Sequence, residues 1–233
     1  MKVVAVHLYV LISLEPSEPN RGPIHVGVTS DSCFENGASE VTPSSETGDY
    51  PMELPLTYIR KLGERTMASG TTLEVAMNEV KVVSFQTGPY KCIGTRNLNG
   101  CTAVTIVSPY AAILAHIAPR APDADPSDIN AGDNNCRAKM DQVTGFYSQN
   151  TQLFPPERTT WVVSALYRGQ PALPDQRRII EEKLQQAGLV YTNAMYLVLD
   201  SNEPRDPEKG TVLVDARKGG QPVVYVEGKA VYQ

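Results

Sequence analysis

The sequence predicts an α+β fold: a mixed, largely antiparallel layered sheet core with flanking helices. Short segments rich in Val, Ile and Thr recur through the chain after residue 70, which is typical of strands. Two predicted hairpins, Cys101–Ile117 and Val223–Tyr232, favour antiparallel pairing. Two later segments place apolar residues at helical spacing. The chain has no internal repeat, coiled coil or break in composition, so we expect one domain over residues 1–233.

The N-terminal 80 residues are predicted to pack on the core or to complete it. The expected elements are strands at Met1–Leu14 and Ile24–Val28, a polar surface segment at Ser30–Pro51 and a helix at Leu54–Ala68. A secretory signal peptide is the alternative for the first apolar run. His7 interrupts that run and no small-x-small cleavage site follows, which favours the strand.

The remaining elements follow from local composition and turn signals. Strands are expected at Thr72–Phe85, Cys101–Val107, Ala111–Ile117, Thr159–Leu166, Tyr191–Leu199, Thr211–Asp215, Val223–Val226 and Lys229–Tyr232, and helices at Arg137–Ser148 and Asp175–Ala187. In the second helix, Pro174 precedes the first turn, Asp175 is the predicted cap and Gly188 ends the helix.

Composition excludes several classes of function. With 41% hydrophobic residues, 233 residues can bury one sizeable core. A net charge of −5 and the absence of a basic stripe argue against a nucleic-acid binder. No apolar run approaches the roughly 20 residues of a membrane-spanning helix. The four cysteines, at 33, 92, 101 and 136, lack zinc-site spacing. We expect free thiols and a cytoplasmic protein, with secretion as the alternative.

One stretch combines a thiol and an imidazole in a way that suggests catalysis. Cys101 follows Asn99 and Gly100 in a Gly- and Asn-rich turn, and His116 ends the return strand of the same predicted hairpin. Cysteine catalysis needs a thiolate, which a nearby imidazole favours. The backbone N–H groups of Asn99 and Gly100 are candidate oxyanion donors. The alternatives are a buried cysteine that only packs and a structural histidine.

The long segment after His116 is a candidate substrate lid. Ala121–Asn135 is rich in Pro, Asp and Asn and shows no helical or strand pattern. Long loops of this kind in compact domains are often functional. Asp123, Asp125 and Asn130 are its candidate substrate contacts. The acidic residues lack the Gly and Glu positions of an EF-hand loop, so no metal site is predicted.

The same stretch resembles the active-site region of the chemoreceptor glutamine deamidase family, CheD. That family places its thiol in a GLGSC-V-A-V-like turn and strand, followed by an A-H-x-x-x-P-like segment. Here the matching segments are 97–104, NLNGCTAV, and 115–119, AHIAP. The family's third catalytic member is a Thr six residues before the Cys, and Thr95 holds that position.

The resemblance covers about residues 82–233 and implies a cysteine hydrolase with a Cys101–His116–Thr95 triad. The expected reaction is deamidation of a carboxamide through a thioester, without a metal or an organic cofactor. The expected substrate is a protein glutamine side chain or a small-molecule amide. Two alternatives stay open: acyl transfer, transamidation or cyclisation at the same thiol, or a non-catalytic binding or regulatory protein on this scaffold. An activated Cys101 is expected to react with iodoacetamide well below the free thiol pKa of about 8.5.

Overall fold

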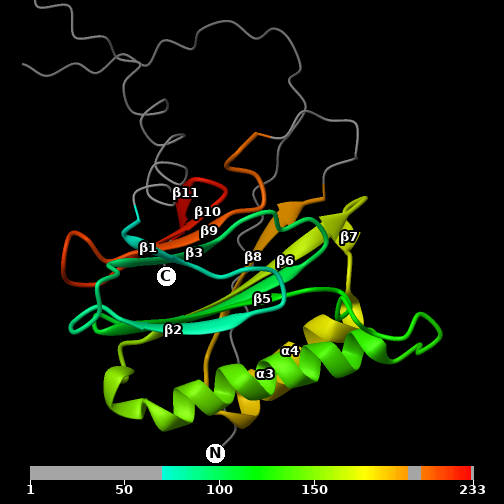
Figure 1. Cartoon of the computed structure of the whole chain (residues 1–233), viewed down its shortest axis with the longest axis horizontal. Helices are drawn as coiled ribbons and strands as arrows, with labels where there is room; N and C mark the ends of the chain where they lie inside the picture. Colours follow the sequence, from blue (N-terminus) through cyan, green and yellow to red (C-terminus); the bar gives the residue numbers. More distant parts are fainter. Residues whose placement is uncertain (1–69, 199–205, 232–233) are drawn as a thin grey trace, which may run out of the picture. The chain divides into compact units, whose positions relative to one another are not determined.

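The computed structural model describes residues 70–198 and 206–231, which lie within one compact unit, Met52–Gln233. The elements predicted for residues 1–69 therefore lie outside the described residues, as does Cys33. The described part is an α+β fold of two mostly antiparallel sheets and two α-helices, which confirms the predicted fold class. In Figure 1 the two sheets and the pair of helices lie in three successive layers.

The first sheet has five strands in the order β1-β3-β9-β10-β11. Their bounds are β1 Thr72–Glu74, β3 Cys92–Thr95, β9 Val212–Asp215, β10 Val223–Val226 and β11 Lys229–Val231. The β1–β3 pair is parallel and the other pairs are antiparallel. The turn between β10 and β11 consists of Glu227 and Gly228, with φ of 49° and 73°. Two positive φ values are typical of a tight hairpin turn, and they confirm the predicted closing hairpin.

The second sheet contains the central hairpin of the predicted site. Its order is β2-β5-β4-β6-β7, and β8 pairs with β6 in parallel. The bounds are β2 Val80–Ser84, β4 Thr102–Val107, β5 Ala111–Ile117, β6 Thr159–Tyr167, β7 Gln170–Pro171 and β8 Thr192–Leu197. The predicted return strand, Ala111–Ile117, is confirmed residue for residue.

Two helices cover the outer face of the second sheet (Figure 1). They are α3, Ala131–Gln149, and α4, Pro174–Gln186; a short 3-10 turn, Thr151–Leu153, follows α3. Met140 of α3 and Ile180 of α4 belong to a buried apolar cluster with Ile113 of β5. No helix among residues 70–198 and 206–231 is both long and apolar enough to cross a membrane.

Side chains of β4 and β5 alternate between two cores. Ala103 and Val107 of β4 belong to the cluster between the sheets, together with Cys101. Val104 and Ile106 belong to the cluster beneath the helices. This alternation follows from the two-residue period of a strand.

The prediction of a single strand at Thr72–Phe85 is wrong. The segment forms β1 and β2, which belong to different sheets. Between them Asn78 adopts a φ of 65°, and the Glu79 carboxylate accepts a hydrogen bond from the Ala76 N–H at 3.0 Å. Asn tolerates this left-handed conformation better than most residues, so a turn forms within the β-branched run.

The helix boundaries also differ from prediction. The helix predicted at Arg137–Ser148 is α3, which begins at Ala131, so its first turns lie within the segment assigned to the lid. Asp175 does not cap α4: Leu173 is the cap residue, Pro174 lies at the first helical position and Asp175 in the first turn. Pro fits there because its missing N–H would have no helical partner. Gly188, with φ of 67°, ends the helix as predicted.

Candidate active site

Thr95 and His116 meet between the two sheets. Thr95 is the last residue of β3 in the first sheet and His116 the sixth residue of β5 in the second. Thr95 Oγ1 lies 2.7 Å from His116 Nδ1, and both side chains are almost completely buried, at 0% and 1% exposure. Two of the three residues proposed for the triad are therefore in direct contact, although they lie 21 positions apart in the chain.

A third group fixes the direction of this hydrogen bond. The Thr95 hydroxyl donates to the Val75 carbonyl oxygen at 2.7 Å. A hydroxyl has one proton, so Oγ1 must accept from His116 Nδ1–H. The ring then carries its proton on Nδ1, and Nε2 has a free lone pair. Nε2 is buried and has no hydrogen-bond partner among the described residues.

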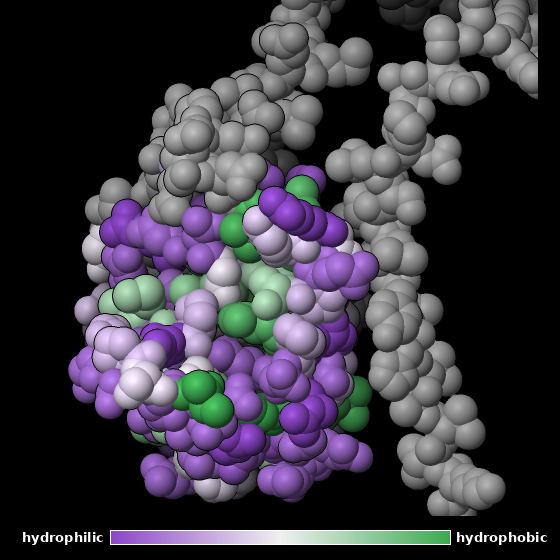
Figure 2. Space-filling model, turned by 90° about the vertical axis from the view of Figure 1, so that its right-hand side faces the viewer, coloured by the Kyte–Doolittle hydropathy of each residue, from purple (hydrophilic) through white to green (hydrophobic). Residues whose placement is uncertain are grey.

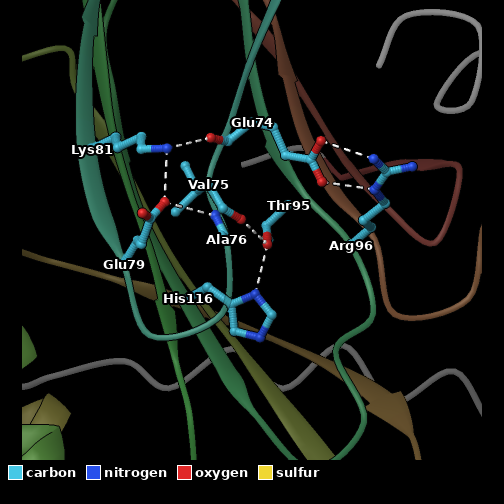
Figure 3. A network of polar contacts seen from close by, with 8 residues as sticks. All are labelled: Glu74, Val75, Ala76, Glu79, Lys81, Thr95, Arg96 and His116. Carbon is cyan, nitrogen blue, oxygen red and sulfur yellow. Dashed lines mark hydrogen bonds and ion pairs between the residues drawn. The ribbon is translucent and has the colours of Figure 1, made fainter. Parts of the chain in front are cut away.

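The turn that supplies the Val75 carbonyl is held from several sides (Figure 3). Val75 N–H donates to the Gly94 carbonyl at 2.8 Å, and His116 N–H donates to the Glu79 carbonyl at 2.9 Å. The side chain of Lys81 donates to the Glu74 carbonyl at 2.8 Å. These bonds join the β1–β2 turn to β3, β5 and β2, so the turn holds its carbonyl over the Thr95–His116 pair.

Cys101 lies on the same side of the second sheet as His116. It directly precedes β4, and Ala103 of that strand is paired with His116 in the antiparallel register. Residues two apart on a strand share a face, so Cys101 and His116 are diagonal neighbours across the pair. Cys101 is 5% exposed and belongs to the apolar cluster between the sheets. The structure therefore brings two members of the predicted triad, Thr95 and His116, into contact, and it places the third, Cys101, on the same face of the β4–β5 pair.

Burial keeps this thiol and imidazole neutral in the resting protein. Desolvation raises the pKa of Cys101, although a hydrogen bond from the Asn99 backbone N–H to its sulfur acts to lower it. Desolvation lowers the pKa of His116 to about 4. The raised pKa of Cys101 is opposite to the lowering expected from the sequence. Burial therefore favours a neutral thiol and a neutral imidazole over a thiolate–imidazolium pair.

Tyr196 of β8 binds the turn that carries Cys101. Its hydroxyl donates to the Cys101 carbonyl oxygen at 2.7 Å and accepts from the Gly100 N–H at 3.0 Å. The predicted role of Gly100 as an oxyanion donor is therefore wrong for this conformation, because its N–H is already bound. The Asn99 N–H points at the sulfur and remains a candidate.

The residues before Cys101 pack closely against a distant segment. Leu98 N–H donates to the Gly210 carbonyl at 2.9 Å. A Cβ on Gly210 would overlap the Leu98 carbonyl oxygen, so only glycine fits there. Gly100 has a φ of 93°, which agrees with the turn predicted before Cys101.

The other two described cysteines have no comparable surroundings. Cys92 donates to Asp215 Oδ1 at 3.5 Å, and Cys136 donates to the Gln176 carbonyl at 3.6 Å. Burial raises the pKa of each to about 12. Both thiols are free, as is Cys101, so a disulfide between Cys92 and Cys101 is absent. Cys136 is buried within α3.

The lid candidates lie on an exposed loop between β5 and α3. Asp125 Oδ1 accepts hydrogen bonds from the N–H and hydroxyl of Ser127, both at 2.8 Å, which stabilise a local turn. Asp123 and Asn130 are exposed. The loop begins next to the residue before Cys101, since a Cβ on Gly100 would lie 4.0 Å from Pro119 Cγ. The structure thus places the start of the loop near Cys101. None of the three lid candidates forms a hydrogen bond with Cys101 or His116.

Figure 2 shows the end of the molecule that faces right in Figure 1, where β5 ends and the segment towards α3 begins. Hydrophobic and neutral surface gathers towards the middle of this face, and hydrophilic residues surround it.

Among residues 70–198 and 206–231, no group of three or more His, Cys, Asp and Glu side chains has the arrangement of a metal site.

The chain matches no protein-family model, and the comparison with curated proteins finds no match. The resemblance to the CheD family therefore stays a prediction that rests on the sequence stretch quoted above.

Sequence reasoning missed two members of the site. Val75 contributes a backbone carbonyl, which no residue type signals. Tyr196 lies 95 residues after Cys101, in a strand recognised only by its composition. A buried tyrosine needs a partner for its hydroxyl, and this requirement was the one available signal.

Proposed function

We propose that the protein is a cysteine hydrolase that deamidates a carboxamide, with Cys101 as nucleophile, His116 as base and acid, and Thr95 as orienting residue. The supporting observation is the Val75–Thr95–His116 hydrogen-bond chain. It places the histidine proton on Nδ1 and leaves Nε2 as an unpaired acceptor on the face that Cys101 shares.

In the proposed reaction His116 Nε2 takes the proton of the Cys101 thiol as the sulfur attacks the carboxamide carbon. The C–N bond then breaks, and the imidazolium gives its proton to the departing ammonia. This leaves a thioester on Cys101 and a neutral ring. Water attacks the thioester while Nε2 accepts its proton, the C–S bond breaks, and the proton returns to the sulfur as the carboxylic acid leaves.

The backbone N–H of Asn99 is the proposed oxyanion donor, because it already hydrogen-bonds the Cys101 sulfur and would adjoin an acyl group formed there. The proposed substrates are a protein glutamine side chain or a small-molecule amide. The three cysteines within residues 70–198 are free thiols, which supports a reducing compartment such as the cytoplasm.

The proposal is tested by ammonia release from a panel of amides: free glutamine, glutamine-containing peptides, an intact glutamine-rich protein and simple primary amides. Cys101→Ala should abolish release from any substrate found. Cys136→Ala, which changes another buried thiol, is the control and should retain it. Equal release by wild type and Cys101→Ala would refute the assignment.

Transamidation or cyclisation is the second candidate, because the same thioester can react with an amine. Product mass separates the two. Deamidation replaces the amide by an acid, whereas transamidation adds the mass of the amine less ammonia. A product that contains the added amine would show that the reaction is acyl transfer and not hydrolysis. The role of Cys101 as nucleophile would stay the same.

A further inference from the structure

Tyr196 is the most highly connected polar side chain at the nucleophile that the proposed chemistry leaves unused. It is 3% exposed, and its one hydroxyl group contacts the peptide units on either side of the Gly100–Cys101 peptide: it accepts from the Gly100 N–H and donates to the Cys101 carbonyl. A hydroxyl donates one hydrogen bond and can accept others, so these two bonds use it as donor and as acceptor. Packing alone would be satisfied by a phenylalanine, which cannot make either bond.

The hydroxyl is suited to a permanent role as donor. Burial raises the pKa of Tyr196 well above its usual range, and a negative charge at Cys101 or at Glu227 acts in the same direction. The titratable groups around this turn are Cys101 within it, Tyr196 on β8, His116 on β5 and Glu227 in the β10–β11 turn. Tyr196 stays protonated through the pH range in which a thiol titrates, so its bond to the Cys101 carbonyl persists.

The position of Tyr196 in the fold explains why it can fix the turn. β8 pairs with β6 in parallel, and β6 pairs with β4, so Tyr196 belongs to the same sheet as β4, the strand that begins directly after Cys101. The turn itself lies outside the strands, with positive φ values at Asn97 and Gly100. Residues in such conformations need outside contacts to keep a single geometry. Tyr196 supplies them at Gly100 and Cys101, and Gly210 supplies one at Leu98.

We propose that Tyr196 is a positioning residue for the nucleophile: by binding the Gly100 N–H and the Cys101 carbonyl, it holds the sulfur against the Asn99 N–H on the face shared with His116. The consequence for turnover rests on the proposed function. The positioning of the thiol does not, and it can be measured without a substrate.

The test measures the rate of iodoacetamide alkylation of Cys101 against pH, by mass spectrometry of its peptide, in wild type, Tyr196→Phe and Tyr167→Phe. Tyr196→Phe keeps the ring but frees the turn, so the Asn99 N–H no longer stabilises the thiolate. The pH midpoint should rise by about half a unit to one unit, the equivalent of one hydrogen bond. Tyr167 is 46% exposed on the neighbouring strand, and its variant should keep the wild-type midpoint. An unchanged midpoint in a folded Tyr196→Phe protein overturns the proposal.

Hydrogen exchange in the wild-type chain gives a second test that needs no variant. The Gly100 amide should be protected because it donates to Tyr196, and Tyr196→Phe should speed its exchange at least about 10-fold. Fast exchange of Gly100 in the folded wild-type protein overturns the proposal even if the variant does not fold.

Turnover separates this proposal from the proposed function. If an amide substrate is found, Tyr196→Phe should lower kcat about 10-fold with little change in KM. If no amide is deamidated but the alkylation midpoint shifts, the positioning role stands and the proposed function fails. If Cys101→Ala abolishes ammonia release but Tyr196→Phe leaves both the midpoint and kcat unchanged, the proposed function stands and the positioning role fails.

Discussion

His116 and Ile117 are neighbours on β5, both almost fully buried, and they point into different layers of the molecule. Ile117 joins the apolar cluster under α3 and α4. His116 lies between the sheets, where a threonine hydroxyl and a backbone carbonyl complete its surroundings. The helix-facing layer therefore gains its stability from apolar burial. In the layer between the sheets, the desolvation of an imidazole and a thiol costs stability, and the hydrogen bonds of the imidazole fix its geometry.

The strongest way to sharpen this comparison is to change His116. His116→Gln keeps a polar side chain of similar length but removes the base. Turnover of any substrate that depends on Cys101 should fall at least about 1000-fold, within the range of general acid–base catalysis. Ammonia release under saturating substrate measures the effect, and retention of more than a tenth of wild-type kcat would contradict the role of His116.

The neighbouring residue should show the opposite behaviour. Ile117→Ala removes three buried carbons from the layer under the helices and should lower the free energy of unfolding by about 2–5 kcal/mol. Urea denaturation measures the loss. The folded fraction should keep near-normal turnover at low temperature, and a 1000-fold loss of kcat there would erase the distinction between the two faces.

The two layers should also differ in their response to acid. The pKa of His116 is about 4 in the folded state, below the value of about 6.5 for an unfolded histidine. Between these values the unfolded chain binds more protons, so stability falls as pH is lowered from about 6.5 to 4. The loss attributable to His116 is at most about 3 kcal/mol.

Denaturation curves at several pH values measure this effect against His116→Gln, which has no titrating group at the position. The variant should lose less stability than wild type across that interval. Parallel curves for the two proteins would mean that His116 titrates normally and is not desolvated.

Thr95 offers a smaller change within the polar layer. Thr95→Val preserves shape but leaves the Nδ1–H of His116 without an acceptor, at a cost of about 1–3 kcal/mol, equivalent to roughly a 10- to 100-fold loss of turnover. Thr95→Ser restores the hydroxyl and should recover most of the activity.

Nitrogen NMR of the His116 ring tests the same contact without a substrate. Wild type should show a protonated Nδ1 and an unprotonated Nε2 at neutral pH. Thr95→Val should move the proton towards Nε2. A wild-type ring with its proton on Nε2 would contradict the hydrogen-bond direction.

Sequence reasoning succeeded where side-chain identity and strand period carry the information. The α+β class and the β4–β5 hairpin follow from β-branched residues and turn signals. Thr95 was singled out only by the resemblance to the CheD family, and it does contact His116 across the two sheets. The split of Thr72–Phe85 was missed, since its Val-rich composition hides the turn at Asn78. The start of α3 was missed because Gly132, Asp133 and Asn135 have low helix propensity, and packing overrides it.

The parts of the site that could not be predicted depend on tertiary contacts. Val75 acts through its carbonyl, which every residue type has. The sequence suggested that the Gly100 N–H is free to bind an oxyanion. In the structure Tyr196 binds this N–H, a contact that depends on the pairing of β8 with β6 and so could not be foreseen. The direction of the Cys101 pKa shift depends on burial by both sheets.

The hydrogen-bond chain that starts at His116 Nδ1 ends on the Val75 carbonyl oxygen, a group that neither releases nor retains a proton near neutral pH. Protons therefore have no exit along it into solvent. A proton taken up at Nε2 must leave again from Nε2, onto the leaving group or back to the sulfur. In the proposed cycle the ring thus holds one proton that it cannot exchange through Nδ1. The departing ammonia, the first product, should carry away the proton that the thiol gave up.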